Sequence, residues 1–330
     1  MSDSPQKIVL GSRGSDLALT QVRMVESELR AAGFAGEIEI KIIRTIGDKR
    51  PDLKLSEFSQ GDQPIVDKGI FTKELEEALL AGEIDVAVHS LKDVPTELGP
   101  EFCLISTLER APIEDVLLTR EPIQPSSVDD LTLLDRGTVA TSSVRRARQL
   151  TWLRPDVEAV DIRGNVPTRV RKLIDTPEWD GIMLARAGLE RLGILPVGGE
   201  TLASFDFEGH TVYAALLDSE KFLPAAGQGA VAIESLKTNA AAAEICALIN
   251  HAPTFTRVTA ERHFLHRLQA GCQTPVGALT AFEDDGATLS MRVRVFDEEA
   301  PDAEPLEGAL SGPADEPETV ANQLYDLIHA

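Results

Sequence analysis

The sequence has 330 residues, too many for one ordinary hydrophobic core, which predicts two or three domains. Its 32 Lys and Arg against 54 Asp and Glu give a net charge of −22, which excludes the broad basic face of a general nucleic-acid-binding protein. The polar start Met1–Lys7 lacks a signal-peptide pattern, and no apolar run is long enough to cross a bilayer. We therefore expect a cytoplasmic monomer that binds neither nucleic acid nor membrane.

The acidic residues are dispersed, and Arg outnumbers Lys among the cations. Such a composition suits a salt-rich cytoplasm, where salt screens the self-repulsion of a halophile-like acidic surface. Solubility alone also selects an acidic surface, so both interpretations remain open.

Short β-branched runs alternate with helical patterns in the first third of the chain. The expected elements are strand Ile8–Ser12, helix Leu17–Ala32, strand Ile38–Thr45, helix Phe71–Ala81, strand Ile84–His89 and strand Cys103–Ser106. This alternation is typical of parallel βαβ units and predicts a doubly wound α/β domain.

The alternation restarts after a crossing point at Glu109–Pro112. The expected elements are strands Val116–Leu118 and Thr138–Ala140, helix Val144–Leu153, strand Ala159–Ile162, helix Thr168–Ile174 and strand Ile182–Leu184. Beyond the Pro- and Gly-marked stretch Leu223–Gln228, the apolar run Ala230–Ile233 would return to the first sheet and make the first domain discontinuous.

The character of the chain changes again near Asn250. The expected elements are helix Phe255–Leu268, the alternating strand Leu289–Val295 and the closing helix Pro317–His329, which predict a small α+β domain. The predicted domains are residues 1–109 with 229–248, residues 113–224, and residues 250–330. The predicted fold class is therefore α/β, with two doubly wound domains and a small α+β C-terminal domain.

Positive charge concentrates in the segment Arg136–Arg191. It holds ten Arg and one Lys against seven acids, a local charge of 11 − 7 = +4. Some of these arginines follow turn residues that would open a helix, as in Thr141-Ser142-Ser143-Val144-Arg145-Arg146, and both guanidinium groups and helix N-termini favour anions. The segment predicts a pocket for a polyanionic ligand; the alternative is exposed arginine that balances an acidic surface.

Polar residues also follow the predicted strand Ile84–His89. Ser90, Lys92 and Asp93 fall beyond its carboxyl end, where α/β sheets bind their ligands. A carboxylate there would stabilise a cationic intermediate or move a proton. The alternative is an exposed turn in which Asp93 pairs with a lysine.

Two further helix starts carry candidate anion-binding residues. Arg13 and Ser15 precede the first helix, and Lys68 precedes Phe71 at the second. Ordinary N-capping by Ser15 explains the first start equally well.

One of the three cysteines has a distinct setting. Cys272 lies in a Gly- and Pro-marked loop, where its thiolate would be accessible for a thioether, whereas Cys103 and Cys246 lie in apolar runs. A small buried hydrophobe is the alternative for Cys272. His263 and His266 share a helix, but two ligands make no metal site, so we expect no metal.

In this order along the chain, these segments resemble the porphobilinogen deaminase (hydroxymethylbilane synthase) family. The matching stretches are Arg13-Gly14-Ser15, Lys68-Gly69-Ile70-Phe71, Val88-His89-Ser90-Leu91-Lys92-Asp93, Thr141-Ser142-Ser143-Val144-Arg145-Arg146, Arg163-Gly164-Asn165-Val166-Pro167-Thr168-Arg169, Ala187-Gly188-Leu189-Glu190-Arg191, Pro224-Ala225-Ala226-Gly227-Gln228 and Ala270-Gly271-Cys272.

The resemblance implies two domains similar to type II solute-binding proteins, a third small domain, and a transferase that condenses four porphobilinogen molecules into hydroxymethylbilane with release of ammonia. It implies a dipyrromethane cofactor joined through a thioether to Cys272 and a catalytic role for Asp93. A growing pyrrole chain carries many carboxylates, which agrees with the polyanion predicted from the arginines.

The resemblance also assigns the binding residues. Those implied for the cofactor are Ser90, Lys92, Thr141, Ser143, Arg145, Arg146 and Arg169. Those implied for porphobilinogen and the growing chain are Arg13, Ser15, Lys68, Phe71, Arg163, Arg191 and Gln228.

The sequence departs from the family pattern at two places, and one rival interpretation of the function stays open. The family's second loop lysine, shortly before the position of Lys68, has no counterpart near Pro64, and Pro167 stands where the family often has glycine. The rival is a non-catalytic binding protein for an organic anion, which would explain the arginines but not Asp93 or Cys272.

Overall fold

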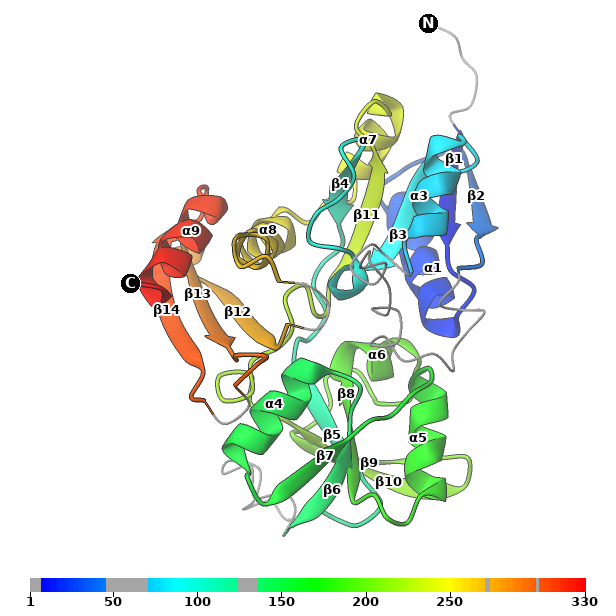
Figure 1. The fold of residues 1–330 in the computed structure, drawn as a ribbon. Coiled ribbons are helices and arrows are strands. Elements are labelled where there is room, and N and C mark those ends of the chain that lie inside the picture. Colours follow the sequence, from blue (N-terminus) through cyan, green and yellow to red (C-terminus); the bar gives the residue numbers. More distant parts are fainter. Residues whose placement is uncertain (1–6, 46–70, 124–135, 271–273, 301–302) are drawn as a thin grey trace, which may run out of the picture. The chain divides into compact units, whose positions relative to one another are not determined.

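The computed structural model describes residues 7–45, 71–123, 136–270, 274–300 and 303–330, which form two compact units (Figure 1). The first unit comprises Met1–Ala111 and Ala230–Thr259, and the second comprises Pro112–Gly229 and Ala260–Ala330. The first unit thus takes residues from both sides of the segment that builds most of the second.

The first unit contains a five-stranded sheet in the order β2-β1-β3-β11-β4. β1 pairs in parallel with β2 and β3, whereas β11 runs antiparallel to β3 and β4. The strands are β1 (Lys7–Ser12), β2 (Glu37–Ile42), β3 (Val86–Ser90), β4 (Phe102–Thr107) and β11 (Val231–Leu236). The helical elements are α1 (Asp16–Ala31), α3 (Lys73–Leu80), the short 3-10 turn η2 (Leu91–Asp93), α7 (Ala240–Ala247) and the start of α8 (Ala252–Arg267).

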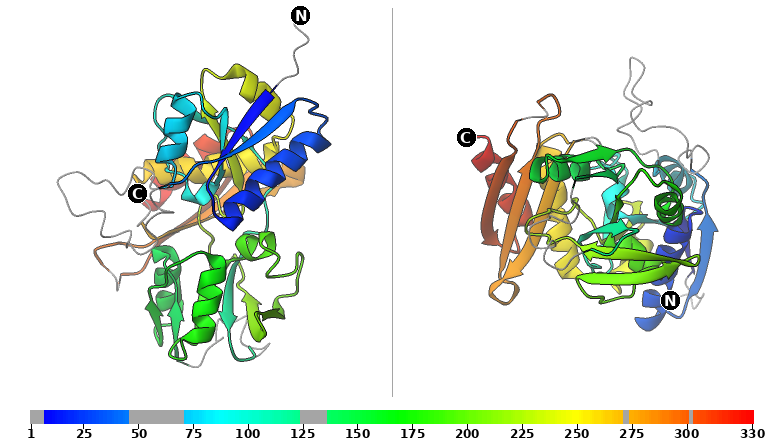
Figure 2. Two further views of the ribbon diagram at one scale, coloured as in Figure 1. Left: turned by 90° about the vertical axis from the view of Figure 1, so that its right-hand side faces the viewer. Right: turned by 90° about the horizontal axis from the view of Figure 1, so that it is seen from below.

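Helix α1 illustrates how the sequence sets a helix in place. The Ser15 hydroxyl accepts a hydrogen bond from the Ala18 amide at its start, and Gly33, with φ of +90°, follows its end. One side of the helix, including Val22, Val25 and Leu29, is fully buried in the core of the first sheet, and Figure 2 shows α1 along that sheet.

The second unit contains a six-stranded sheet in the order β7-β6-β8-β5-β10-β9. β6 pairs in parallel with β7 and β8, while β5, β10 and β9 add antiparallel pairs. The strands are β5 (Asp115–Thr119), β6 (Gly137–Ala140), β7 (Val157–Val160), β8 (Gly181–Ala185), β9 (Leu202–Phe207) and β10 (His210–Leu216). The helices are α4 (Val144–Leu153), α5 (Val166–Asp175) and α6 (Arg186–Arg191).

The same unit holds an antiparallel three-stranded sheet, β12 (Val276–Glu283), β13 (Thr288–Val295) and β14 (Leu306–Pro313), with the short turn η4 (Asp284–Gly286). Helix α9 (Pro317–Ile328) lies along one face of this sheet (Figure 2). Gly308 allows this close packing, because a Cβ there would lie 2.3 Å from Cγ2 of Ile328.

The predicted α/β class with a small α+β C-terminal part is confirmed. The expectation of parallel pairing is right for β1, β2 and β3 and for β6, β7 and β8, but wrong for β4, β5 and β11, which run antiparallel to their neighbours. β11 does return to the first sheet, as expected. The sequence analysis missed α6, α7, the β9–β10 hairpin, β12 and β14. The three domain boundaries stay a prediction.

Substitution of Gly308 by Val should destabilise the second unit, because the added side chain enters the space of Ile328 and overpacking typically costs about 1–3 kcal/mol. Urea unfolding would measure the loss. The control is Ala309→Val, which adds two methyl groups at the next, exposed position of β14. Equal stability of the two variants would contradict the packing argument.

Candidate functional site

Strand β3 leads directly into the turn that carries the predicted catalytic residue. In η2, Leu91 is buried, while Lys92 and Asp93 are exposed. The Leu91 amide donates to the Ala230 carbonyl at 3.0 Å, next to the start of β11. The buried leucine therefore anchors the turn, and the two charged side chains face outward from the end of the strand.

Strand β1 lies beside β3 and runs parallel to it, so the two strands end at the same edge of the first sheet. Gln21, buried on α1, donates from its amide to the Ser90 hydroxyl at 2.7 Å. The guanidinium group of Arg13 lies over the Phe71 ring, 4.1 Å from its centroid. With the capping Ser15, six predicted site residues of this unit thus gather in the region where these strands end: Arg13, Ser15, Phe71, Ser90, Lys92 and Asp93.

A buried pair behind this turn was missed by the sequence analysis. Nε2 of His89 and Oε2 of Glu234 are 2.9 Å apart, and both side chains are buried. Nearby Glu76 on α3 has a raised pKa, mainly because of burial and secondly because of the charge of Glu234. A polar, titratable residue in each of two apolar strands, His89 in β3 and Glu234 in β11, was the available signal in the sequence.

In the second unit, helix α4 begins where the parallel strand β6 ends. The Ser143 amide donates to the Thr141 hydroxyl at 3.2 Å, and the Ser143 hydroxyl accepts from the Arg146 amide at 3.4 Å. Thr141 is buried and Ser143 is half-buried. The predicted Ser/Thr turn is therefore the cap of α4, and it points the helix N-terminus toward the carboxyl edge of the second sheet.

Helix α5 begins in the same way after β7. Asn165 caps it by accepting from the Thr168 amide at 2.9 Å. Arg163 forms an ion pair with Asp161 at 3.0 Å, and Nε of Arg169 donates to the Gly164 carbonyl at 2.7 Å. Both arginines are half-buried beside this helix start. Since β6 and β7 are parallel neighbours, the starts of α4 and α5 share one edge of the sheet.

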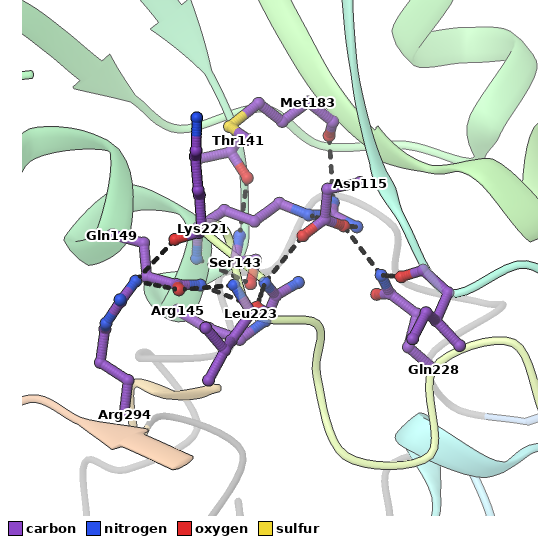
Figure 3. Close-up of polar contacts among 12 residues, drawn as sticks. Asp115, Thr141, Ser143, Arg145, Gln149, Met183, Lys221, Leu223, Gln228 and Arg294 are labelled. Atoms are coloured by element: carbon purple, nitrogen blue, oxygen red, sulfur yellow. Dashed lines mark hydrogen bonds and ion pairs between the residues drawn. The ribbon is translucent and has the colours of Figure 1, made fainter. Parts of the chain in front are cut away.

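Arg145 and Arg146 occupy a different environment, although they belong to the same motif. Figure 3 shows Arg145 beside Asp115. Both arginines are buried and form ion pairs with the fully buried carboxylate of Asp115, at 2.7 and 2.8 Å. Burial alone would raise the pKa of Asp115, but the two guanidinium charges and their hydrogen bonds hold it well below its usual range. The pKa of Arg145 is lowered, mainly by burial.

Gln228 is also fully buried. Its amide donates to the Ile113 carbonyl at 2.6 Å and to Oδ1 of Asp115 at 3.0 Å. Arg191, at the end of α6, donates to the Gly229 carbonyl at 2.7 Å, and burial lowers its pKa to about 10. Gln228 thus ties the segment that leaves the second sheet to the start of β5, and Arg191 binds the next residue of that segment.

Two predicted site residues, Lys68 and Cys272, lie outside the described residues, as does Pro64. Of the other cysteines, Cys246 is buried and burial raises its pKa to about 12, while burial also raises the pKa of Cys103. Thiols with raised pKa values are poor nucleophiles near neutral pH. Neither cysteine has the properties of a reactive attachment point.

The described part of the chain holds no group of three His, Cys, Asp or Glu side chains arranged to bind a metal ion. Within the same residues, no helix combines the length and the apolar character needed to cross a membrane.

The donors present suit a ligand rich in carboxylates. Arg13 and Lys92 lie at the strand ends of the first sheet, and the helix N-termini with Arg163 and Arg169 lie at those of the second. Guanidinium groups and helix starts bind carboxylates, and the exposed carboxylate of Asp93 offers the opposite charge to a cationic reaction centre.

Comparison with known proteins gives a consistent result along the chain. Residues 8–244 match the family model "Porphobilinogen deaminase, dipyromethane cofactor binding domain", and residues 255–328 match "Porphobilinogen deaminase, C-terminal domain". The chain is 42% identical over 283 residues to the porphobilinogen deaminase of Syntrophomonas wolfei, covering 86% of this chain and 83% of that one. It is 41% identical over 321 residues to that of Desulforudis audaxviator, covering 97% and 93%.

Replacing Asp115 by Asn should lower the free energy of unfolding at pH 7 by about 3–5 kcal/mol, the usual cost of removing one partner of a buried ion pair. The folded-state pKa of Asp115 lies below the unfolded value of about 3.9, so its stabilisation is complete above that pH and declines as the pH falls below it. Urea unfolding of both proteins should therefore show a constant difference between pH 5 and pH 7 and a shrinking one below about pH 4.

The control for that series is Glu208→Gln, which removes an exposed ion pair with Arg171 and should leave the free energy of unfolding nearly unchanged. A difference between wild type and Asp115→Asn that does not depend on pH would contradict an ionised Asp115.

Proposed function

The chain belongs to the porphobilinogen deaminase family, and from this premise we propose which of its residues carry the reaction. The enzyme is a transferase of tetrapyrrole biosynthesis that condenses four porphobilinogen molecules stepwise into hydroxymethylbilane and releases ammonia. The observation that carries this conclusion is the match of both family models, in order, over residues 8–244 and 255–328. It excludes the rival interpretation as a non-catalytic binding protein.

The first domain of the family is a dipyrromethane cofactor-binding domain. When bound, the cofactor supplies the free pyrrole carbon from which the chain grows. We propose Cys272 as its covalent attachment point. The support is chemical, since the other two cysteines have raised pKa values and Cys246 is buried.

Asp93 is proposed as the catalytic carboxylate. Its exposed position at the end of β3 leaves it accessible to a substrate, and the turn is anchored by buried Leu91. A carboxylate near a pyrrole nitrogen stabilises the positive charge that develops there when the aminomethyl group of porphobilinogen leaves as ammonia. Lys92 beside it is proposed to hold a carboxylate of the cofactor.

The remaining polar residues of the predicted site are proposed to hold carboxylates of the cofactor, the substrate and the growing chain. The arrangement of Arg13 over Phe71 supports a shared binding role, because the ring fixes the plane of the guanidinium group. The other residues proposed to bind these carboxylates are Ser15, Lys68, Ser90, Thr141, Ser143, Arg145, Arg146, Arg163, Arg169, Arg191 and Gln228.

The enzyme is further proposed to be a cytoplasmic monomer whose acidic surface is adapted to salt. The support is the net charge of −22 and the excess of Arg over Lys.

Substitution of Cys272 by Ser should abolish both the added mass of two linked pyrrole units and the turnover of porphobilinogen, because the hydroxyl is a far weaker nucleophile than a thiolate. Intact mass and a product assay would measure both. The matched control, Cys103→Ser, should keep both. Retention of the added mass in Cys272→Ser would rule out Cys272 as the attachment point.

Substitution of Asp93 by Asn preserves the shape of the side chain and removes its charge. It should lower kcat by about 10²–10³-fold, as commonly follows the loss of a preorganised charge, while the cofactor stays attached. Single-turnover kinetics and intact mass would separate these effects. Asp326→Asn, an exposed change on α9, serves as control. A kcat close to wild type would move the catalytic role to another residue.

A further inference from the structure

A buried polar pair lies behind the turn that carries Asp93. It joins His89, near the end of β3, to Glu234 within β11. Resting on the proposed function, we propose that His89 and Glu234 are positioning residues for the reaction: they fix the end of β3 and thereby the place of the Asp93 carboxylate. The pair thus acts on the substrate only through the turn that follows it.

The two side chains meet across neighbouring antiparallel strands (Figure 1). His89 has Ala232 as its partner in β11, and Glu234 lies two residues further along, on the same face of the sheet. Nε2 of His89 and Oε2 of Glu234 are 2.9 Å apart, and the two side chains are 4% and 0% exposed. So little exposed surface leaves no room for a substrate, so any effect on the reaction must pass through neighbouring residues.

The register of β11 against β4 shifts at Glu234. Ile233 pairs with Ser106, whereas Glu234 pairs with Leu104, so the pairing skips one residue of β4. Bulges of this kind recur beside active sites, where they turn a side chain in a particular direction. Here the shift coincides with the residue whose carboxylate reaches His89, so the irregular pairing favours this contact.

Three consecutive residues lead into the turn, and each is held by a different contact. The Ser90 hydroxyl accepts from the Gln21 amide of α1 at 2.7 Å. The Leu91 amide donates to the Ala230 carbonyl at 3.0 Å. The buried pair holds the first of the three, His89, on the face of β3 opposite to Ser90. Without the pair, the strand end would be held by α1 and one backbone bond alone, and the turn would lose its fixed orientation.

The pair carries costs that stability alone does not explain. Oε1 of Glu234 is buried and has no hydrogen-bond partner among the described residues. A second carboxylate, that of Glu76 on α3, has a raised pKa, first because of burial and then because of the charge of Glu234. Apolar side chains of similar size would avoid both costs. A polar pair at this place therefore favours a role in function over a role in stability.

A double-mutant cycle separates positioning from a general loss of stability. Glu234→Ala should lower the single-turnover rate of ammonia release by about 10–100-fold, because a small misplacement of a catalytic group has effects of this size. The cofactor mass should remain, and KM should change less than kcat. In the Asp93→Asn background the same substitution should cost little further activity, since the carboxylate that it misplaces is already absent. Equal losses in the two backgrounds would overturn the proposal.

A conservative variant tests whether the contact itself matters. Glu234→Gln keeps an oxygen beside His89 and should therefore retain most of the wild-type rate. A rate as low as that of Glu234→Ala would assign the effect to the charge of Glu234 and would refute the positioning role.

The control for stability is Ile245→Ala on α7, which removes buried apolar volume from the core of the same unit. It should lower the resistance to urea while kcat stays at the wild-type value. A loss of kcat in Ile245→Ala equal to that in Glu234→Ala would attribute the effect to stability and would count against the proposal.

If Glu234→Ala does not fold, His89→Leu combined with Glu234→Leu takes its place, since apolar replacement of both partners of a buried pair is often neutral for stability. The single-turnover rate should again fall, and a wild-type rate would refute the proposal. A wild-type rate in Asp93→Asn would remove the catalytic role of Asp93, and this inference with it. A slow Asp93→Asn beside an unimpaired Glu234→Ala would overturn this inference alone.

Discussion

A buried carboxylate remains ionised only where other groups replace the water that it loses, and Asp115 meets this condition through two guanidinium groups and one amide. The requirement determines much of the second unit. The arginines must come from α4, the amide must come from the segment that leaves the sheet, and β5 must begin at Asp115. Removal of any one partner would take a hydrogen bond from the buried carboxylate, so these elements depend on one another.

The accessible polar residues follow a different rule. In both sheets they stand where parallel strands end: Asp93 follows β3, Ser143 follows β6 and Arg163 follows β7. Backbone amides at helix starts and guanidinium groups act there on the same kind of ligand. The family's reaction requires this combination, because the pyrrole chain and the substrate are anionic at their side chains, while positive charge develops on the porphobilinogen that loses ammonia.

The sequence predicts most accurately those elements whose ends carry capping or helix-breaking residues. Helix α4 was predicted at its observed bounds, Val144–Leu153, because Ser143 caps it and Pro155 follows it closely. The β9–β10 hairpin was missed, since both strands are partly exposed and neither is apolar throughout. Antiparallel β11 could be assigned to the first sheet from its apolar character, but its direction depends on the path of the chain through the second unit.

The environment of a predicted site residue likewise depends on contacts between distant parts of the chain. Arg145 and Arg163 each follow a strand and accompany a polar helix start, so the sequence predicts an anion contact for both. The difference between them is a partner 30 positions earlier in the chain, Asp115, which lies just outside the predicted strand Val116–Leu118. The ion pair between Arg145 and Asp115 is a tertiary contact, and no local pattern in the sequence reports it.

The charges of Asp115, Arg145 and Arg146 do not cancel. Two guanidinium groups against one carboxylate leave a formal charge of 2 − 1 = +1 in the interior of a chain whose net charge is −22. Surface charges are screened by salt, but a charge within the protein is screened much less. Such a charge behind the N-terminus of α4 adds to the helix dipole in the direction that favours carboxylates. Arg145 and Arg146 therefore add positive charge close to the start of α4.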